Sequence, residues 1–393
     1  MPSLYSAANP VAIALYILGF VALAYQVVAI LASLFYRLES QLVRRRAPPA
    51  SLPPISVLKP VRGLDTGFAA AILSHAVQDY PEFEILFGVH SLDDPAVLSI
   101  RNLIAANPEV SIRVVECTTA APNGKVGVLM DLLPEARHPV LVVNDSDISV
   151  PRDYLRRLAA RLVIDKPGLI TCLYRATAGS VAGIWEAFGI SVDFIPSALV
   201  APQVGVREFG LGSTLCFRRD DLVRAGGFAA VANYIADDYQ LAKRITAVCG
   251  RALFSEVVVQ TDLDHPSWRS VWQHQLRWAR TLRACRGAGF LGLPITHAGV
   301  WIALAMVFGL WSLAFMLIAA RLVMAIVSGF LAVESLLALL LAPLAPLWDL
   351  WAFAIWLCSL MGRTVEWRGQ RFRLSQDGIL EPVSEAPVSE PRP

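Results

Sequence analysis

The sequence predicts an α/β domain with a mainly parallel sheet, attached to a membrane by one N-terminal helix and by two or three C-terminal helices. Short apolar strands alternate with helical segments through the middle of the chain, which is the pattern of βαβ units. Apolar stretches flank this region on both sides. Of the 393 residues, 55% are hydrophobic and only 17% are charged, whereas a soluble domain carries about a quarter charged residues. The apolar excess therefore belongs in a membrane.

The first apolar segment, residues 11–35, contains no charged side chain. About 20 such residues in a helix cross the hydrocarbon core, and the segment is too long for the apolar part of a signal peptide. Arg37 and the run Arg44-Arg45-Arg46 follow it. Because basic residues stay on the cytoplasmic side, we expect the N-terminus outside and the next domain in the cytoplasm. Residues 36–54, basic and then rich in proline, are predicted to be a linker.

The polar domain is predicted to span residues 55–286. Strands are expected at 55–60, 83–90, 111–116 and 140–144, with helices at 67–77, 96–106 and 126–133. The fourth strand, VLVVN, is almost wholly apolar, as a central parallel strand buried on both faces should be. Ligands of such sheets bind beyond the carboxyl ends of the strands, so functional side chains are expected at that edge.

Three acidic groups stand out in this domain. They are Asp93-Asp94, Asp145-Ser146-Asp147 and Asp237-Asp238. The second directly follows VLVVN, and two carboxylates one residue apart at a strand end can bind one Mg²⁺ or Mn²⁺, which commonly bridges to substrate phosphates. A cation there would neutralise a diphosphate as its bond to a sugar breaks. Asp145 and Asp147 are therefore the predicted metal ligands; the alternative is a solvated turn whose Asp residues cap the next helix.

Asp237 and Asp238 are predicted to supply the catalytic base. A transfer that inverts the configuration of the sugar needs a group that takes the proton from the attacking hydroxyl. Two adjacent carboxylates hinder each other's ionisation, which keeps one of them basic. The same residues suit the N-terminus of a helix expected at 239–247, where Asp favours the helix dipole. The two roles are compatible.

Cationic and aromatic residues complete the predicted site. Arg277-Trp278 offers a guanidinium that forks onto phosphate oxygens and a ring that covers a sugar. Alternatively, Arg277 belongs to a basic patch that meets anionic lipid head groups. Lys59 ends the first strand and Lys125 precedes Asp145 by 20 residues. Either lysine can meet the nucleotide or its phosphates, or be an ordinary surface lysine. A glycine-rich turn at 210–214 permits close backbone approach to a ligand.

The second apolar block, residues 293–362, is predicted to divide near Arg321 into spans at 298–320 and 322–341. A third stretch, 347–362, carries Asp349 and three tryptophans, and it either spans or lies in the interface. Three spans would leave the C-terminus outside, whereas the arginines that follow indicate a cytoplasmic flank. We favour two full spans and an interfacial helix. Residues 363–393 are expected to form a basic segment and a disordered tail.

The composition also excludes other classes of protein. The formal net charge is +2 and no basic domain stands apart, so no nucleic-acid partner is expected. The six cysteines form no CxxC pair, which indicates neither a zinc site nor a disulfide framework.

With these motifs, the chain resembles the ceramide glucosyltransferase family, glycosyltransferase family 21. The D1, D2, D3 and (Q/R)xxRW motifs of that family look like Asp94, Asp145, Asp238 and Arg277-Trp278 here. Further similarity covers 57–60, 218–220, 225–227 and 367–374 (WRGQRFRL).

The resemblance implies a GT-A nucleotide-sugar fold and a UDP-sugar donor. Asp94 would then hold the uridine side of the donor, while Asp145 and Asp147 would hold the metal and the diphosphate. Asp238 would be the base, and Arg277-Trp278 would close over the diphosphate.

One position departs from the family, because the first residue of (Q/R)xxRW is His274. This histidine, with 171–175 (TCLYR) and 236–239 (ADDY), looks more like the bacterial hopanoid-biosynthesis branch, which transfers N-acetylglucosamine to bacteriohopanetetrol. The resemblance thus implies UDP-N-acetylglucosamine as donor, a hopanoid polyol as lipid acceptor, and the bacterial inner membrane as location. His274 is counted with the substrate-binding residues. UDP-glucose with ceramide is the alternative pair. A processive polysaccharide synthase is a further alternative, but it needs more spans.

Overall fold

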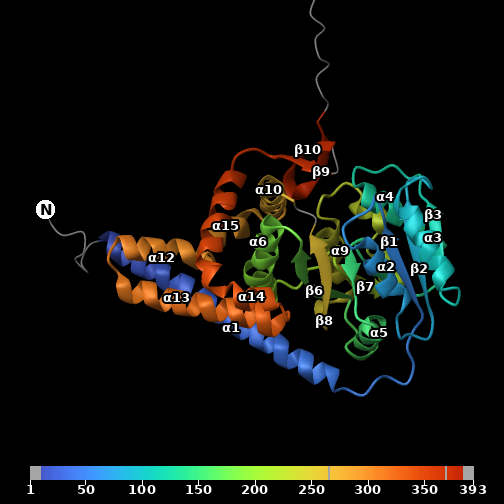
Figure 1. Ribbon diagram of the computed structural model, residues 1–393, viewed down its shortest axis with the longest axis horizontal. Coiled ribbons are helices and arrows are strands. Elements are labelled where there is room, and N and C mark those ends of the chain that lie inside the picture. The colour runs from blue at the N-terminus through green and yellow to red at the C-terminus, as the bar shows by residue number, and fades with distance from the viewer. Residues whose placement is uncertain (1–9, 264–265, 368–369, 384–393) are drawn as a thin grey trace, which may run out of the picture.

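The computed structural model describes residues 10–263, 266–367 and 370–383. Figure 1 shows two parts side by side. One is a sheet with helices on both faces. The other is a group of long helices in which α1 (Pro10–Arg44), α12 (Ala298–Val307) and α13 (Trp311–Ile326) contact one another.

The large sheet has eight strands in the order β3-β2-β1-β4-β7-β6-β8-β5. β1 is parallel to β2 and β4, β2 to β3, and β6 to β8, whereas β7 and β5 are antiparallel to their neighbours. The mainly parallel sheet expected from the sequence is confirmed. The strands are β1 (Ile55–Pro60), β2 (Phe83–Val89), β3 (Ser111–Glu116), β4 (Val140–Val143), β5 (Ile148–Ser149), β6 (Leu169–Ala178), β7 (Leu215–Arg218) and β8 (Ala252–Leu263).

Helices cover both faces of this sheet because alternate strand residues point to opposite sides. On β1, Val57 belongs to a core cluster under α2, α3 and α5, and Leu58 belongs to a second cluster under α4 and α9. The helices of the domain are α2 (Phe68–Ala76), α3 (Ala96–Ala106), α4 (Gly124–Glu135), α5 (Tyr154–Ile164), α6 (Val181–Gly189), the π-helix η1 (Ile190–Phe194), α7 (Ile195–Gln203), α8 (Arg219–Arg224), the 3-10 turn η2 (Phe228–Val231), α9 (Asp237–Cys249) and α10 (Trp268–Cys285).

Helix α1 is longer than expected, and this corrects the predicted linker at 36–54. The helix continues to Arg44, so residues 36–44 are helical and only the rest has no helix. Its C-terminal half docks on the sheet: the Tyr36 hydroxyl donates to the carbonyl of Ser255 at 2.9 Å, and Arg44 donates to that of Glu256 at 2.9 Å. These contacts with β8 hold the part of α1 that follows its predicted membrane-spanning segment.

The division of the second apolar block also differs from the prediction. Arg321 does not separate two spans but lies inside α13, 1% exposed, with its guanidinium on both carboxylate oxygens of Asp349 at 2.8 and 2.7 Å. The break falls instead near Gly309, where φ is +70°. The elements after α10 are α11 (Gly287–Leu291), η3 (Leu293–Ile295), α12, α13, the π-helix η4 (Val327–Ala332), α14 (Leu336–Leu340), η5 (Ala342–Leu344) and α15 (Ala345–Ser359).

By length and composition, four helices in the described residues can cross a membrane: Pro10–Arg44, Val181–Gln203, Trp311–Ala332 and Ala342–Ser359. Gly287–Ile295 and Ala298–Val307 form a further pair that bends by 45°. The second helix was not among the predicted spans. It joins β6 to β7, which are antiparallel neighbours. The chain therefore leaves the sheet and re-enters it at the same end of these strands. This helix alone therefore cannot carry the chain across a bilayer.

The C-terminal segment is folded, contrary to the expected basic segment and tail at 363–393. It forms a small sheet in the order β11-β10-β9, with β9 (Thr364–Trp367), β10 (Gln370–Leu374) and β11 (Leu380–Pro382), and a 3-10 turn η6 (Gln376–Gly378). On β10, Phe372 and Leu374 are buried while Arg371 and Arg373 are exposed, which is the two-residue period of a half-buried strand. The remaining part of the predicted tail, 384–393, lies outside the described residues.

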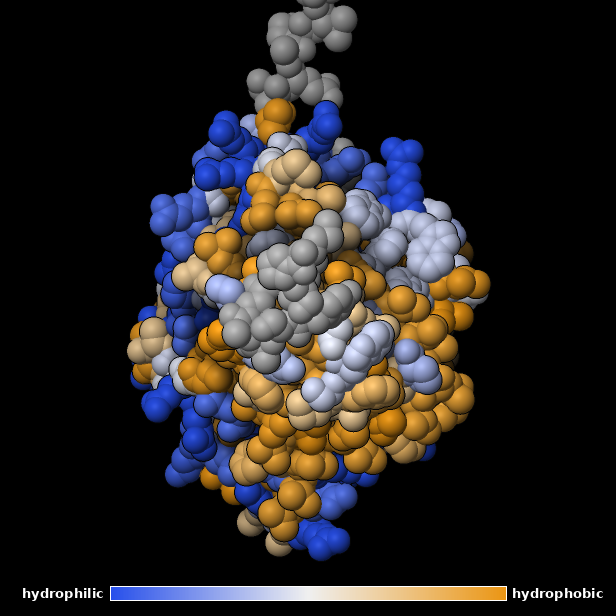
Figure 2. Space-filling view, turned by 90° about the vertical axis from the view of Figure 1, so that its left-hand side faces the viewer, coloured by the Kyte–Doolittle hydropathy of each residue, from blue (hydrophilic) through white to orange (hydrophobic). Residues whose placement is uncertain are grey.

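The helical part presents an apolar surface. Figure 2 shows hydrophobic residues gathered over the end of the molecule formed by α1, α12 and α13. The exposed large side chains there include Ile17, Phe20, Val307, Trp311 and Phe315. A contiguous apolar surface of this kind indicates contact with lipid or another apolar partner.

Candidate active site

The end of β4 is fixed by one buried amide. Asn144 is fully buried and its Nδ2 donates to the carbonyl of Ser213 at 2.6 Å and to the hydroxyls of Tyr154 and Thr214 at 3.0 and 3.2 Å. These bonds tie β4 to the antiparallel strand β7. The chain therefore leaves the sheet with Asp145 in a defined position.

Lys125 brings two of the acidic groups together. Its Nζ lies 2.7 Å from an oxygen of Asp145 and 3.2 Å from an oxygen of Asp237. Burial alone would lower the pKa of Lys125, but the carboxylates of Asp145 and Asp237 overcome it and raise that pKa. The lysine is positioned by the first turn of α4, which Asn123 caps through its side-chain oxygen. The second and third acidic groups thus share one cation.

Asp238 lies on the other side of a glycine from Asp145. Its carboxylate accepts from the backbone N–H of Gly212 at 2.9 Å and from that of Tyr239 at 2.7 Å. A Cβ added at Gly212 would lie 2.7 Å from Asp145 Oδ2 and 3.6 Å from Asp238 Oδ2, so the two carboxylates converge on this residue. Burial, and then the charge of Asp237, raises the pKa of Asp238 to about 6. That value suits a base at neutral pH.

Asp237 and Asp238 also begin a helix, as the alternative interpretation required. They occupy the first turn of α9. Asp237 is 8% exposed and accepts from Asn123 Nδ2 at 3.3 Å as well as from Lys125. It holds Lys125 and the start of α4 in place, while Asp238 is the more accessible of the two carboxylates.

Asp145 and Asp147 stay the predicted ligands of a divalent cation. Asp147 accepts from the hydroxyl of Thr261, and burial followed by the charge of Asp145 raises the pKa of its carboxyl group. Among the described residues, no cluster of three His, Cys, Asp or Glu side chains surrounds this point. Mg²⁺ commonly binds through one or two carboxylates together with waters and substrate phosphates. The pair therefore fits a cation that is completed by a diphosphate.

Lys59 lies beneath the acidic loop. It is fully buried, and its Nζ donates to the carbonyl of Asp145 at 3.0 Å. Burial lowers the pKa of Lys59 to about 7, and the carboxylates of Asp147 and Asp145 oppose this shift. The placement favours support of the loop over the direct contact with a nucleotide that the sequence suggested.

Asp94 belongs to a neighbouring loop. Its carboxylate accepts from the backbone N–H of Gly63 at 2.9 Å and from that of Ala96 at 2.9 Å, so it joins the end of β1 to the start of α3. Asp94 therefore positions the loop that carries Arg62. A direct contact between Asp94 and uridine stays a prediction.

Helix α10 places His274 against α6 and Trp278 against η1. His274 Nδ1 lies 2.6 Å from an oxygen of the buried Glu186 on α6, and the imidazole ring lies 4.7 Å from that of Trp278. Trp278 in turn lies 5.8 Å from Phe194, centroid to centroid. Arg277 is on the same helix and half-buried; its contact with a diphosphate stays a prediction.

Tyr174 connects α10 with the acidic centre. Its ring lies 5.5 Å from that of Phe194. Burial raises the pKa of the Tyr174 hydroxyl, and the carboxylates of Glu186 and Asp238 raise it further. Phe194 therefore lies between Tyr174 and Trp278 of α10, and the hydroxyl of Tyr174 is within the electrostatic influence of Asp238.

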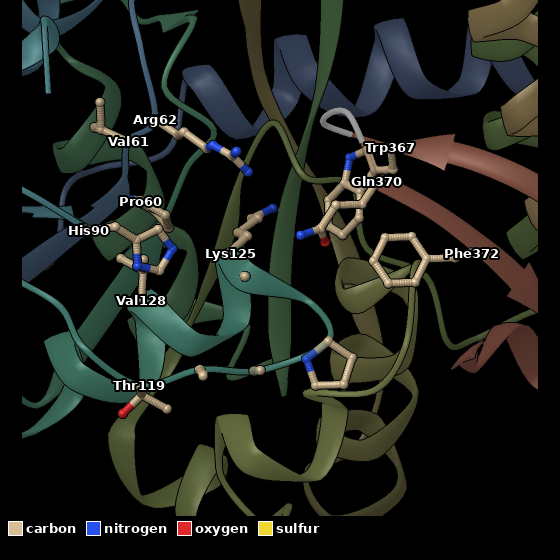
Figure 3. Close-up of a pocket in the computed structure, with 14 residues that line it drawn as sticks. Pro60, Val61, Arg62, His90, Thr119, Lys125, Val128, Trp367, Gln370 and Phe372 are labelled. Carbon is tan, nitrogen blue, oxygen red and sulfur yellow. The ribbon is translucent and has the colours of Figure 1, made fainter. Parts of the chain in front are cut away.

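A cavity of about 190 Å³ opens beside Lys125. Figure 3 shows Arg62, Lys125 and Gln370 pointing their polar ends into the same space, with His90 at one side. The lining comes from the ends of β1, β2 and β3, the start of α4, and the C-terminal strands, as Pro60, Val61, Arg62, His90, 119–122, Gly124, Lys125, Val128, Trp367, Gln370 and Phe372. Lys125 links this cavity to Asp145 and Asp237.

The sequence interpretation missed Arg62, His90 and Glu186. Arg62 lies two residues after the first predicted strand and His90 ends the second, so the rule that ligands bind at the carboxyl ends of strands already pointed to them. Glu186 lies in an apolar stretch 88 residues before its partner His274, and no spacing pattern indicates that pair.

Three comparisons place the chain among known proteins. The family model described as Glycosyl transferase family 21 matches residues 14–380. Ceramide glucosyltransferase 1 of Caenorhabditis elegans is 27% identical over 203 residues, which is 51% of this chain and 43% of that protein. Ceramide glucosyltransferase of Komagataella phaffii is 28% identical over 152 residues, 36% of this chain and 30% of that protein. The match thus spans less than half the length of these curated relatives.

A solved structure shows the same fold. The mannosyltransferase of Pyrobaculum calidifontis, in complex with GDP-Man and Mn²⁺, superposes with a TM-score of 0.51 and 20% identity, covering 87% of this chain and 97% of that one. This likeness and the sheet order confirm the GT-A type of fold that the motifs implied. Since the family model covers most of the described residues, including the acidic groups and α10, the chain belongs to glycosyl transferase family 21.

Proposed function

We propose that this protein is an inverting, membrane-bound glycosyltransferase that moves a sugar from a UDP-sugar to the hydroxyl of a lipid. The observation that carries the proposal is the convergence of Asp145 and Asp238 on Gly212, with Lys125 bridging to Asp237. In this arrangement, residues that can bind a diphosphate lie beside a carboxylate that can accept a proton.

The donor site follows from these charges. Lys125 and Arg62 offer cations at the cavity, and Asp145 and Asp147 offer carboxylate oxygens. A divalent cation held by Asp145 and Asp147 would supply charge that stabilises the leaving diphosphate. His274, Arg277 and Trp278 on α10 complete the enclosure in this proposal, with Arg277 forking onto phosphate oxygens.

The chemical step needs one proton acceptor. The acceptor hydroxyl attacks the anomeric carbon, a new C–O bond forms, and the C–O bond to the diphosphate breaks on the opposite face of the sugar. Asp238 accepts the hydroxyl proton, and the nucleoside diphosphate leaves with the bonding electrons. The raised pKa of Asp238, about 6, keeps it ionised yet basic at neutral pH.

The apolar helices favour a lipid acceptor. Helix α7 contacts α1, and the segment η1 contacts α13, so an apolar surface lies close to the element that carries Phe194 and faces Trp278. A lipid tail can stay in this surface while its hydroxyl reaches Asp238. Arg37 and Arg44 to Arg46 support a cytoplasmic position for the domain. The resemblance to the hopanoid-biosynthesis branch supports the bacterial inner membrane as its location.

Within this class we propose N-acetylglucosamine transfer to a hopanoid polyol such as bacteriohopanetetrol. His274 supports it, because the histidine replaces the Gln or Arg of the family motif and is held by Glu186. The names of the relatives support the alternative of glucose transfer to ceramide. A processive polysaccharide synthase is disfavoured, because a polymer channel needs more spans than the apolar helices after α10 provide.

A product assay tests the proposal. The full chain in lipid nanodiscs is supplied with UDP-N-acetylglucosamine or UDP-glucose, each with bacteriohopanetetrol or ceramide, and products are identified by mass spectrometry. One glycolipid and an equal amount of UDP are expected. A polymer would replace the proposal with the synthase, and absence of UDP release with every pair would contradict it.

A further inference from the structure

One wall of the cavity beside Lys125 comes from a distant part of the chain. Trp367 on β9 and Gln370 and Phe372 on β10 line it, although these strands follow all the apolar helices. Figure 3 shows Trp367 and Gln370 on the opposite side of the cavity from Pro60 and His90. The cavity is therefore closed only because the C-terminus returns to the catalytic domain.

Backbone hydrogen bonds fasten the small sheet to the acidic centre. The N–H of Ile235 donates to the carbonyl of Gly378 at 3.0 Å, and the N–H of Leu380 donates to that of Asn233 at 2.8 Å. Gln240 of α9 donates to the carbonyl of Asp377 at 3.1 Å. The chain that leads into Asp237-Asp238 is thus part of the same hydrogen-bonded unit as β11.

Helix α10 holds the other end of this unit. Arg280 donates to the carbonyls of Thr364 and Met361 at 2.7 and 3.0 Å. Val365, Phe372 and Leu374 form a common apolar cluster with Ile235, against which Trp367 packs. The wall is therefore supported by two elements that carry site residues, which fixes its distance from Lys125.

The size and chemistry of the cavity indicate what it holds. Its volume of about 190 Å³ is below the ~300–1,000 Å³ of pockets that enclose a whole drug-sized ligand. It can hold one portion of a nucleotide sugar. Because the diphosphate is assigned to Lys125 and Asp145, the portion left for this cavity is the nucleoside. An aromatic ring with an adjacent amide matches a planar base, which stacks on aromatic faces and bonds through its edge.

We propose that Trp367 and Gln370 are donor-binding residues: the indole covers one face of the nucleoside base, and the carboxamide bonds to its edge. This inference rests on the proposed function, since it assumes a nucleotide donor. It gives the C-terminal sheet a part in substrate binding that the acidic motifs do not include.

Binding of UDP and of inorganic diphosphate to the full chain in nanodiscs, measured by calorimetry with Mn²⁺, tests this assignment. Trp367→Ala is expected to weaken UDP binding roughly ten-fold, the effect of removing one stacking surface. Gln370→Ala is expected to weaken it roughly five-fold, as for one lost hydrogen bond. Diphosphate binding should not change, because neither residue meets the phosphates. Glu366→Gln on β9 is the matched control, since Glu366 is exposed and does not line the cavity.

The outcomes separate the two proposals. Wild-type affinity for UDP in both Trp367→Ala and Gln370→Ala overturns the assignment and leaves the proposed function intact. A wild-type chain that binds no nucleoside diphosphate overturns the proposed function itself. If Trp367→Ala melts at a lower temperature than wild type, Gln370→Ala, whose side chain is exposed, decides the test. Equal losses of UDP and diphosphate binding would indicate collapse of the wall and contradict base recognition.

Discussion

At the scale of single residues, Lys125 and Gly212 organise the site. Lys125 pairs with both Asp145 and Asp237, and Gly212 allows Asp145 and Asp238 to approach from either side. Without the lysine, carboxylates from two parts of the chain would repel each other more strongly. The repulsion between the acidic groups is therefore reduced before any donor binds.

Asp238→Asn tests the base. The amide keeps the shape of the side chain but cannot accept the proton, so kcat is expected to fall by about 10²–10⁴-fold. UDP affinity should remain that of the wild type, because the carboxylate of Asp238 accepts hydrogen bonds from the backbone N–H groups of Gly212 and Tyr239 and is not assigned to the diphosphate. Steady-state rates and calorimetry check both points. Near-normal turnover would contradict the assignment.

The pH profile gives a second residue-scale prediction. The pKa of Asp238 is raised to about 6, and only its ionised form can take a proton. Below pH 6, kcat/KM is therefore expected to fall about ten-fold per pH unit, and above pH 7 it should be level. Asp237 and Asp145 raise this pKa while Lys125 lowers it. The acid limb should vanish in Asp238→Asn; an unchanged limb would assign it to another group.

Gly212→Ala tests the convergence of the carboxylates. The new Cβ would lie 2.7 Å from Asp145 Oδ2, and the end of a side chain moves more easily than backbone. We expect near-native melting but roughly ten-fold weaker Mn²⁺-dependent UDP binding, since a misplaced charged ligand costs about 1.4 kcal/mol or more. Gly179→Ala is the control, because nothing lies within 4 Å of its added Cβ. Equal UDP binding in both variants would contradict the predicted geometry.

At the scale of elements, one ion pair connects the apolar helices. Arg321 of α13 holds Asp349 of α15 and donates to the carbonyl of Val192 in η1 at 3.0 Å, and Asp349 accepts from the N–H of Gly299 in α12. Arg321, which the sequence placed at a boundary between spans, thus lies with Asp349 inside the helix group. The two residues orient η1, which carries Phe194 against Trp278.

Arg321→Met is expected to leave Asp349 buried without its cation and to destabilise the protein by about 3–5 kcal/mol. Thermal unfolding in detergent measures the loss. Arg321→Met combined with Asp349→Leu removes both charges and should recover most of the stability, because an apolar pair of similar volume replaces the ion pair. If Arg321→Met alone were as stable as the wild type, the ion pair would not contribute to stability.

At the scale of the whole molecule, the return of the C-terminus limits the topology. α10 and β9 both contact the catalytic domain, so the chain between them must cross the membrane an even number of times. The two-span arrangement with an interfacial helix meets this condition, and three spans do not. We therefore predict that the N-terminus and the C-terminus lie on opposite sides of the membrane.

Reporter fusions test this arrangement. Fluorescent protein fused after residue 393 should be active in cells, and alkaline phosphatase at the same point should not, because β11 lies against the domain that we propose to be cytoplasmic. The pattern should reverse for fusions at the N-terminus. Phosphatase activity at the C-terminus would exclude an even number of crossings.

The sequence alone determined the parts that depend on local patterns. Periodic apolar residues located the first four strands and three helices, with ends within one or two residues of those observed. The rule for strand ends located Asp145 and Asp147 beyond β4. The pattern Arg-Phe-Arg-Leu at 371–374 also carried the period of a strand, but its positive charge favoured a reading as a basic flank.

Only the tertiary structure decided which distant residues meet. Lys125 lies 112 residues before Asp237 and His274 lies 88 residues after Glu186, and such pairs leave no periodic signal. The same holds for the closure of the cavity by Trp367 and for the burial of Arg321 against Asp349. A charged residue in an apolar run is read from sequence as a boundary, because its burial becomes favourable only when a partner elsewhere in the chain is brought to it.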